Sequence, residues 1–137
     1  MKPYGRRLIV HLGFEAAVGE VSRAIRDEGL EIIGRIDVRD HFRQDLRRDF
    51  RQYALLEAWT PELALEALRR NPDVGGLLST TFAIYELSAD ETVVMATGRR
   101  PTTDSLAASA DREITRVGRV LQRLQYGVPR HVALPAA

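Results

Sequence analysis

The sequence predicts an α+β fold, a two-layer α/β sandwich in which helices cover one face of a mostly antiparallel sheet. Strand-like and helix-like segments alternate in the order β-α-β-α-β-α-β-β-α, with no internal repeat or linker. Two strand-like segments, residues 76–87 and 92–97, are separated by four turn-forming residues, which is typical of an antiparallel hairpin. With 137 residues, of which 45% are hydrophobic, the chain fits a single domain over residues 1–137. We expect its core within residues 6–126 and a loose tail over residues 127–137.

The first half of the chain predicts two strands and two helices. The strands are residues 6–12 (RRLIVHL) and 30–38 (LEIIGRIDV), and the helices are residues 14–28 and 39–50. The first helix has apolar residues at helical spacing, namely Phe14, Val18, Val21 and Ile25. Gly29 follows it and is typical of the residue that ends a helix. The second helix is polar, with a narrow apolar stripe made of Phe42, Leu46 and Phe50.

The second half adds a third strand over residues 52–59, a helix over 61–70, the hairpin and a long helix over 104–126. Thr60 is a good N-cap, and Pro61 suits the first helical position because its missing N–H would have no partner there. The apolar residues of the last helix are spaced four, three, four and three: Ala110, Ile114, Val117, Leu121 and Leu124. This spacing predicts one continuous apolar stripe.

Composition excludes several classes of function. The formal net charge of +1 creates no large field for nucleic acid or an anionic membrane, so we expect neither as a partner. The chain has no Cys, which excludes disulfides, thiol nucleophiles and thiolate metal sites. No apolar run of signal-peptide or membrane-spanning length is present, so a cytoplasmic protein is expected. No sequence feature indicates a cofactor.

Neither face of the predicted sheet carries mainly charged residues. Along the fourth strand Leu78, Thr80, Phe82 and Ile84 alternate with Leu77, Ser79, Thr81, Ala83 and Tyr85. A sheet with helices on one face normally has polar, solvated residues on the other. We therefore expect the second face to be covered by a second copy of the chain, a docked terminus or a ligand. Symmetric dimers are common, and a homodimer is the main expectation.

Few residues form a pattern that indicates catalysis. Asp37, His41 and Asp45 are spaced by four, which is adequate for a metal site or a general base but equally typical of an exposed, salt-linked helix face. His11 and His131 have no second His at ligand spacing. No nucleophile motif or phosphate-binding Gly-rich loop is present, so we assign no catalytic residue and no metal ligand.

Two groups of arginines are candidate anion sites. Arg39, Arg43 and Arg47 repeat every four residues, with aspartates interleaved, which indicates a solvated mixed-charge face or an anion site. Arg99 and Arg100 precede the last helix, near the hydroxyls of Thr102, Thr103 and Ser105. That second group could bind an anion beside the helix N-terminus, or it is an ordinary surface loop.

Ordered landmarks over residues 13–97 resemble those of the domain-of-unknown-function family 302 (DUF302). They are Gly13-Phe14 at a helix start, Ile36-Asp37-Val38, Tyr53, Pro61, the stretch NPDVGGLL, and Ile84-Tyr85-Glu86. The resemblance implies a fold similar to the two-layer fold of the TATA-binding protein, with members that form dimers. It implies no reaction, because the family's biochemical role is not established, and a shared fold does not imply DNA binding.

The chain departs from the family pattern at two places. Many members have Cys-Asn-Pro where this chain has Trp59-Thr60-Pro61, and Pro-Cys-Asn or Pro-Cys-Arg where it has Ser79-Thr80-Thr81. Both thiols are therefore replaced here, whereas Asp37 is retained. The resemblance leaves open whether the two replaced positions line one pocket and whether Trp59 fills a space that relatives leave open.

We interpret the chain as a small homodimeric protein without catalysis, a small-ligand-binding or accessory module. The expected ligand site comprises Asp37, Trp59, Thr60, Thr80, Thr81 and Tyr85. Its aromatic rings would supply apolar contact, its hydroxyls orientation and Asp37 a single charge. The alternatives are an enzyme with Asp37 or His41 as general base, and a structural protein whose free sheet face binds another chain.

Overall fold

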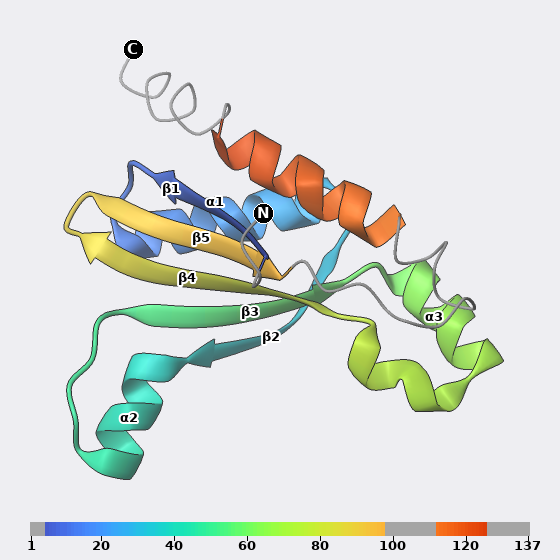
Figure 1. Cartoon of the computed structure of the whole chain (residues 1–137), viewed down its shortest axis with the longest axis horizontal. Coiled ribbons are helices and arrows are strands. Elements are labelled where there is room, and N and C mark those ends of the chain that lie inside the picture. Colours follow the sequence, from blue (N-terminus) through green and yellow to red (C-terminus); the bar gives the residue numbers. More distant parts are fainter. Residues whose placement is uncertain (1–4, 98–111, 126–137) are drawn as a thin grey trace.

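The structure, a computed structural model, describes residues 5–97 and 112–125. Its centre is a five-stranded sheet in the order β1-β5-β4-β3-β2, in which all neighbouring strands are antiparallel (Figure 1). The strands are β1 (Gly5–Val10), β2 (Glu31–Asp37), β3 (Tyr53–Trp59), β4 (Thr80–Ser88) and β5 (Glu91–Thr97). The predicted hairpin is the β4–β5 pair. The two-layer α+β fold class is therefore confirmed.

The second layer consists of α1 (Phe14–Asp27) and a C-terminal helix over residues 112–125. The predicted stripe of α1 is buried: Phe14, Val18, Val21 and Ile25 are at most 7% exposed. Gly29 follows the C-cap residue Glu28 with a φ of 83°, which Gly adopts without the steric cost that a side chain would add. The periodic apolar pattern and the terminal glycine thus define this helix, as predicted.

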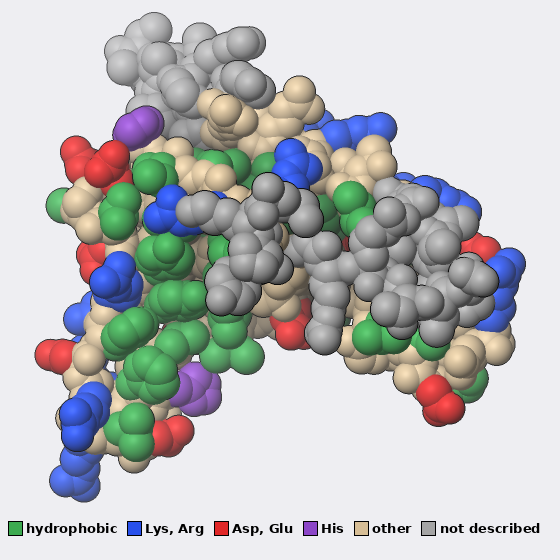
Figure 2. All heavy atoms as spheres, viewed as in Figure 1, with side chains coloured by type: hydrophobic (Ala, Val, Ile, Leu, Met, Phe, Trp, Pro, Cys, Tyr) green, Lys and Arg blue, Asp and Glu red, His purple; other side chains and the backbone are tan. Residues whose placement is uncertain are grey.

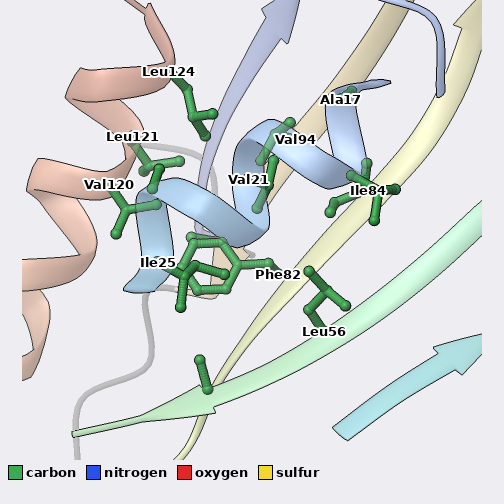
Figure 3. Packing of buried hydrophobic residues seen from close by; sticks show 14 of the residues in the cluster. Ala17, Val21, Ile25, Leu56, Phe82, Ile84, Val94, Val120, Leu121 and Leu124 are labelled. Atoms are coloured by element: carbon green, nitrogen blue, oxygen red, sulfur yellow. The ribbon is translucent and has the colours of Figure 1, made fainter. Parts of the chain in front are cut away.

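The core lies between these two helices and one face of the sheet (Figure 3). Phe82 and Ile84 of β4 alternate inward and are fully buried, together with Leu56 of β3. The C-terminal helix adds Val117, Val120, Leu121 and Leu124, four members of the predicted stripe or its neighbours. Each such fully buried aliphatic or aromatic side chain contributes about 1.5–3 kcal/mol to folding. This packing fixes which face of each strand remains on the outside.

The remaining helices lie beyond the two ends of the sheet (Figure 1). At one end, α2 (Val38–Leu46) connects β2 to β3 and has no buried residue. At the other end, α3 (Pro61–Arg70) packs Ala67 against Val74 of the 3₁₀ helix η1 (Pro72–Leu77). None of the described helices combines the length and the apolar composition that crossing a membrane requires.

Two predicted boundaries are wrong by more than two residues. The helix predicted over residues 39–50 ends at Leu46, because Arg47 adopts a left-handed φ of 54° and the chain then turns back. The strand predicted from residue 76 begins only at Thr80. Residues 76 and 77 belong to η1 instead, which begins where the Asn71 side chain accepts a hydrogen bond from the Asp73 N–H.

The last predicted helix, over residues 104–126, is described only over residues 112–125. Its remaining residues and the predicted tail over residues 127–137 lie outside the described residues.

Candidate functional site

The face of the sheet that points away from α1, here called the open face, is largely apolar. Directly paired residues of antiparallel strands share a face, so the register defines its members. They are Arg7, Ile9, Glu31, Ile36, Tyr53, Leu55, Glu57, Trp59, Thr81, Ala83, Tyr85, Val93 and Met95. Ile9 is 40% exposed and Ile36 is 44% exposed, which is high for strand isoleucines. The described parts of the chain therefore do not fully cover this face.

An unbroken series of aromatic rings extends the open face onto α2. Tyr53 and Tyr85 stack with ring centroids 5.2 Å apart, and Phe50 lies 6.1 Å from Tyr53. Phe42 of α2 meets Phe50 edge-on at 5.3 Å. Burial raises the pKa of Tyr53, and the neighbouring Tyr85 adds to this rise. Figure 2 shows the result as an area of hydrophobic side chains that runs from the strands down to α2.

A small cavity of about 290 Å³ lies on the other side of the sheet, at the start of α1. Asp37 lines it, and its Oδ1 accepts hydrogen bonds from Nε and Nη2 of Arg35 at 3.1 and 2.9 Å. Three arginines and three carboxylates line the cavity in all: Arg35, Arg39 and Arg43 with Glu15, Asp37 and Asp40. Nε of Arg39 is buried and has no hydrogen-bond partner in the described chain. The lining is thus rich in charge but balanced in sign.

Of the six predicted ligand residues, only Asp37 lines this cavity. Trp59 and Tyr85 both lie on the open face but far apart. Tyr85 pairs with Tyr53, and Tyr53 is six residues from Trp59 along β3, a separation of roughly 20 Å at strand geometry. Trp59 is half-buried, and its Nε1 donates a hydrogen bond to Oε1 of Glu31, its cross-strand partner, at 3.1 Å. The two aromatic residues therefore do not contact one small ligand together.

The three threonines of the predicted site also divide between surfaces. Thr80 pairs with Ala58 on the buried face, whereas Thr81 lies on the open face, where its N–H donates to Oγ1 of Thr97. Thr60 occupies the predicted N-cap position of α3, but its side chain makes no capping hydrogen bond and is buried. The structure thus distributes the predicted site over a cavity, the core and the open face.

The other predicted sites either form no metal-binding group or lie outside the described residues. His41 is exposed on α2, and His11 lies 3.6 Å from the carboxylate of Glu91. Across residues 5–97 and 112–125, no group of three His, Asp or Glu residues could hold a metal ion, which argues against a metal set of Asp37, His41 and Asp45. His131 and the candidate anion loop of Arg99, Arg100, Thr102, Thr103 and Ser105 lie outside the described residues.

Comparisons with known proteins agree on one relationship. The family model described as "Domain of unknown function DUF302" matches residues 7–125. An uncharacterized conserved DUF302 protein from Bacillus stearothermophilus has a similar crystal structure, with a TM-score of 0.65 and 18% sequence identity. The match covers 90% of this chain and 98% of that one. At this identity the likeness concerns the fold alone. No curated protein matches.

Proposed function

Because this chain belongs to the DUF302 family, whose function is unknown, we propose a role for it from its geometry. It acts as a non-catalytic homodimeric binding or accessory module, and the two copies meet through their open faces. The observation that carries the proposal is the apolar surface formed by the open face and the adjoining rings of α2. Exposed apolar areas of this kind on a soluble domain typically mark an interaction surface.

A second copy of the chain suits this surface because the surface is self-complementary in charge. In a two-fold symmetric interface the same surface of each copy meets the other in reverse. The open face carries Arg7 on its β1 side and Glu57 on β3, both exposed, and neither makes an ion pair within the described chain. A two-fold axis between the two positions would let each Arg7 meet the partner's Glu57. The middle of the face, between them, is apolar.

The β2 edge of the sheet is a less suitable place for two copies to join. At the β2 edge the pairing with β3 is interrupted between Ile32 and Gly34. Such a bulge twists the edge and disrupts the regular row of hydrogen-bonding groups that a second strand would need. A face-to-face contact is therefore a better arrangement than strand pairing at the β2 edge.

Ala83→Arg tests the proposal, because Ala83 lies in the middle of the open face between Leu55 and Met95. We expect the wild-type protein to have twice its chain mass of 15.4 kDa in sedimentation equilibrium, and the variant to be a folded monomer. Leu65→Arg is the matched control, since Leu65 is 51% exposed on α3, away from the face. A monomeric wild type, or a variant that stays dimeric, would overturn the proposal.

A charge exchange tests the orientation of the two copies. Arg7→Glu and Glu57→Arg should each weaken the dimer, because each places like charges opposite one another. The double variant restores both pairs and should recover most of the wild-type dimer affinity. If the double variant instead loses as much dimer affinity as the two single variants together, the two positions do not meet.

The alternative of an enzyme with Asp37 or His41 as general base has less support in the geometry. Oδ1 of Asp37 is occupied by two hydrogen bonds from Arg35, and His41 is not among the residues that line the Asp37 cavity. A general base needs a free path to the proton that it removes. The two residues therefore do not form a shared site in this structure.

A further inference from the structure

A second cavity, of about 430 Å³, lies between β1 and the C-terminal helix. Its described lining comes from these two elements alone: Arg6, Arg7, Leu8, Thr115, Gly118, Arg119, Leu121, Gln122 and Gln125. Three of these residues are arginines and none is acidic, whereas the Asp37 cavity has equal numbers of both. The described lining of the cavity is therefore cationic, although the whole chain carries a formal net charge of only +1.

Two of the arginines that line it have no acidic partner among residues 5–97 and 112–125. Neither Arg6 nor Arg119 makes an ion pair or a side-chain hydrogen bond within the described part of the chain. Elsewhere on the surface arginines are commonly paired, as Arg116 is with Glu62 at 3.2 Å and Arg43 with Asp49 at 3.2 Å. Guanidinium groups that converge without a carboxylate present several donors to an incoming oxyanion.

Gly118 provides the space in which the Arg6 side chain lies in this cavity. A Cβ added at this position would lie 2.9 Å from an Nη atom of Arg6, closer than such atoms approach in real structures. Glycine in the interior of a helix destabilises that helix relative to alanine, so its presence calls for a reason in packing or function. Here the missing side chain leaves the room in which the Arg6 guanidinium lies against the C-terminal helix.

We propose that this cavity binds the oxyanion group of a small organic molecule, a phosphate ester or a carboxylate, through Arg6 and Arg119. The amides of Gln122 and Gln125 supply further polar contacts, and Leu8 and Leu121 contact the organic part of the ligand. The volume is within the range of small-molecule sites and exceeds what inorganic phosphate alone would fill. The site lies between β1 and the C-terminal helix; it shares Arg7 with the open face, but the proposed contacts come from Arg6 and Arg119, which are not members of that face.

The first experiment is a titration of ¹⁵N-labelled protein with inorganic phosphate, phenyl phosphate and malonate, followed by amide and guanidinium NMR signals. We expect saturable shifts for residues of β1 and the C-terminal helix, and tighter binding of phenyl phosphate than of inorganic phosphate. The preference between phenyl phosphate and malonate distinguishes a phosphate ester from a carboxylate ligand. Absence of saturable binding by all three would overturn the proposal.

Three substitutions distinguish ligand binding at this cavity from a general effect of the protein's net charge. Arg6→Gln and Arg119→Gln should each weaken binding by roughly fivefold to tenfold, as loss of a charge-assisted hydrogen bond does. Arg48→Gln is the matched control, because Arg48 is exposed and does not line the cavity. Equal weakening by all three variants would show that only net charge matters and would overturn the site.

Gly118→Ala is a test in which weaker binding cannot be explained by loss of folding. The added methyl group displaces the Arg6 guanidinium, whose far end is flexible, and should weaken binding severalfold. At the same time alanine favours the helix, so the melting temperature should stay the same or rise. Wild-type affinity in this variant would contradict the role of Gly118 and of the Arg6 position.

Discussion

Truncation of Phe82 to alanine is the most direct test of which face of the sheet carries the core. Phe82 lies on the central strand β4, is 0% exposed, and packs beneath α1 near Ile25 (Figure 3). Its strand neighbours are Leu56 on β3 and Ala96 on β5. Because Ala96 is already small, it offers little side chain to fill the space that the ring would leave.

The expected loss follows from full burial and poor collapse of the site. Phe82→Ala should lower the free energy of unfolding by about 3–5 kcal/mol, the range for phenylalanine truncation in a core. At this chain length each kcal/mol corresponds to about 3–4 °C, so the melting temperature should fall by roughly 9–20 °C. Phe82→Leu retains most of the apolar volume and should cost only about 1–1.5 kcal/mol.

Urea and thermal unfolding, followed by circular dichroism, measure these losses. All variants must be compared at one protein concentration, because a dimer's apparent stability depends on it. Leu87→Ala is the control on the same strand; Leu87 is 44% exposed, so its loss should stay within about 0.5 kcal/mol. A loss of less than about 1 kcal/mol for Phe82→Ala would refute the packing of α1 on β4.

Three further predictions concern single residues. Burial raises the pKa of Glu113, and this outweighs the lowering by the adjacent Thr60, so the folded state binds the proton more tightly than the unfolded state. Stability should therefore fall as the pH rises from the ordinary carboxyl pKa of 4.5 through the raised value, and urea unfolding of Glu113→Gln should lack this part of the decline. Gly29→Ala should cost about 1–2 kcal/mol in the same assay, because φ is 83° there and the added Cβ approaches Arg116; an unchanged stability would contradict that backbone conformation. Asp37→Asn should change stability by less than about 1 kcal/mol, since its pair with Arg35 is partly exposed to solvent; global unfolding would instead identify Asp37 as a structural residue.

Much of the fold can be predicted from local patterns in this one sequence. The spacing of Val18, Val21 and Ile25, with Gly29 after them, is sufficient to place α1 to within one residue. The alternation through Phe82 and Ile84 correctly separates the two faces of β4. These patterns can be recognised in the sequence because each depends only on the periodicity of one helix or one strand.

The errors arise where the conformation is set by a single backbone angle or by a short-range cap. Residues 39–50 form one amphipathic pattern, and nothing in the sequence indicates that Arg47, a good helix former, takes a left-handed conformation. The apolar stretch from residue 76 resembles a strand, but the preceding Asn71 cap and two adjacent glycines favour a 3₁₀ turn. The Arg47 conformation is thus absent from the local pattern, whereas the Asn71 cap and the glycines are local signals that prevail over the apolar stretch.

The surfaces could be predicted less well than the elements, because they depend on register between strands. Tyr53 and Tyr85 are both landmarks of the sequence, but their stacking results from the pairing of β3 with β4, and the two residues are 32 positions apart in the chain. Likewise the cationic cavity joins Arg6, near the start of the chain, to Arg119 in its last described helix. Only the three-dimensional arrangement shows that these arginines line one cavity and that its described lining contains no carboxylate.

The register also changes the interpretation of the two positions at which the family resemblance implies cysteine in relatives. In this chain those positions are occupied by Trp59 and Thr80, and they lie on opposite faces of the sheet: Trp59 pairs with Glu31 on the open face, and Thr80 is buried opposite Ala58. Side chains on opposite faces of a strand pair point away from each other, so thiols at these positions could not share one ligand without a change of register. Trp59 therefore does not fill a pocket that also contains Thr80. Its Nε1 donates to Glu31, its cross-strand partner on β2, which places any role of Trp59 on the open face with the proposed dimer contact.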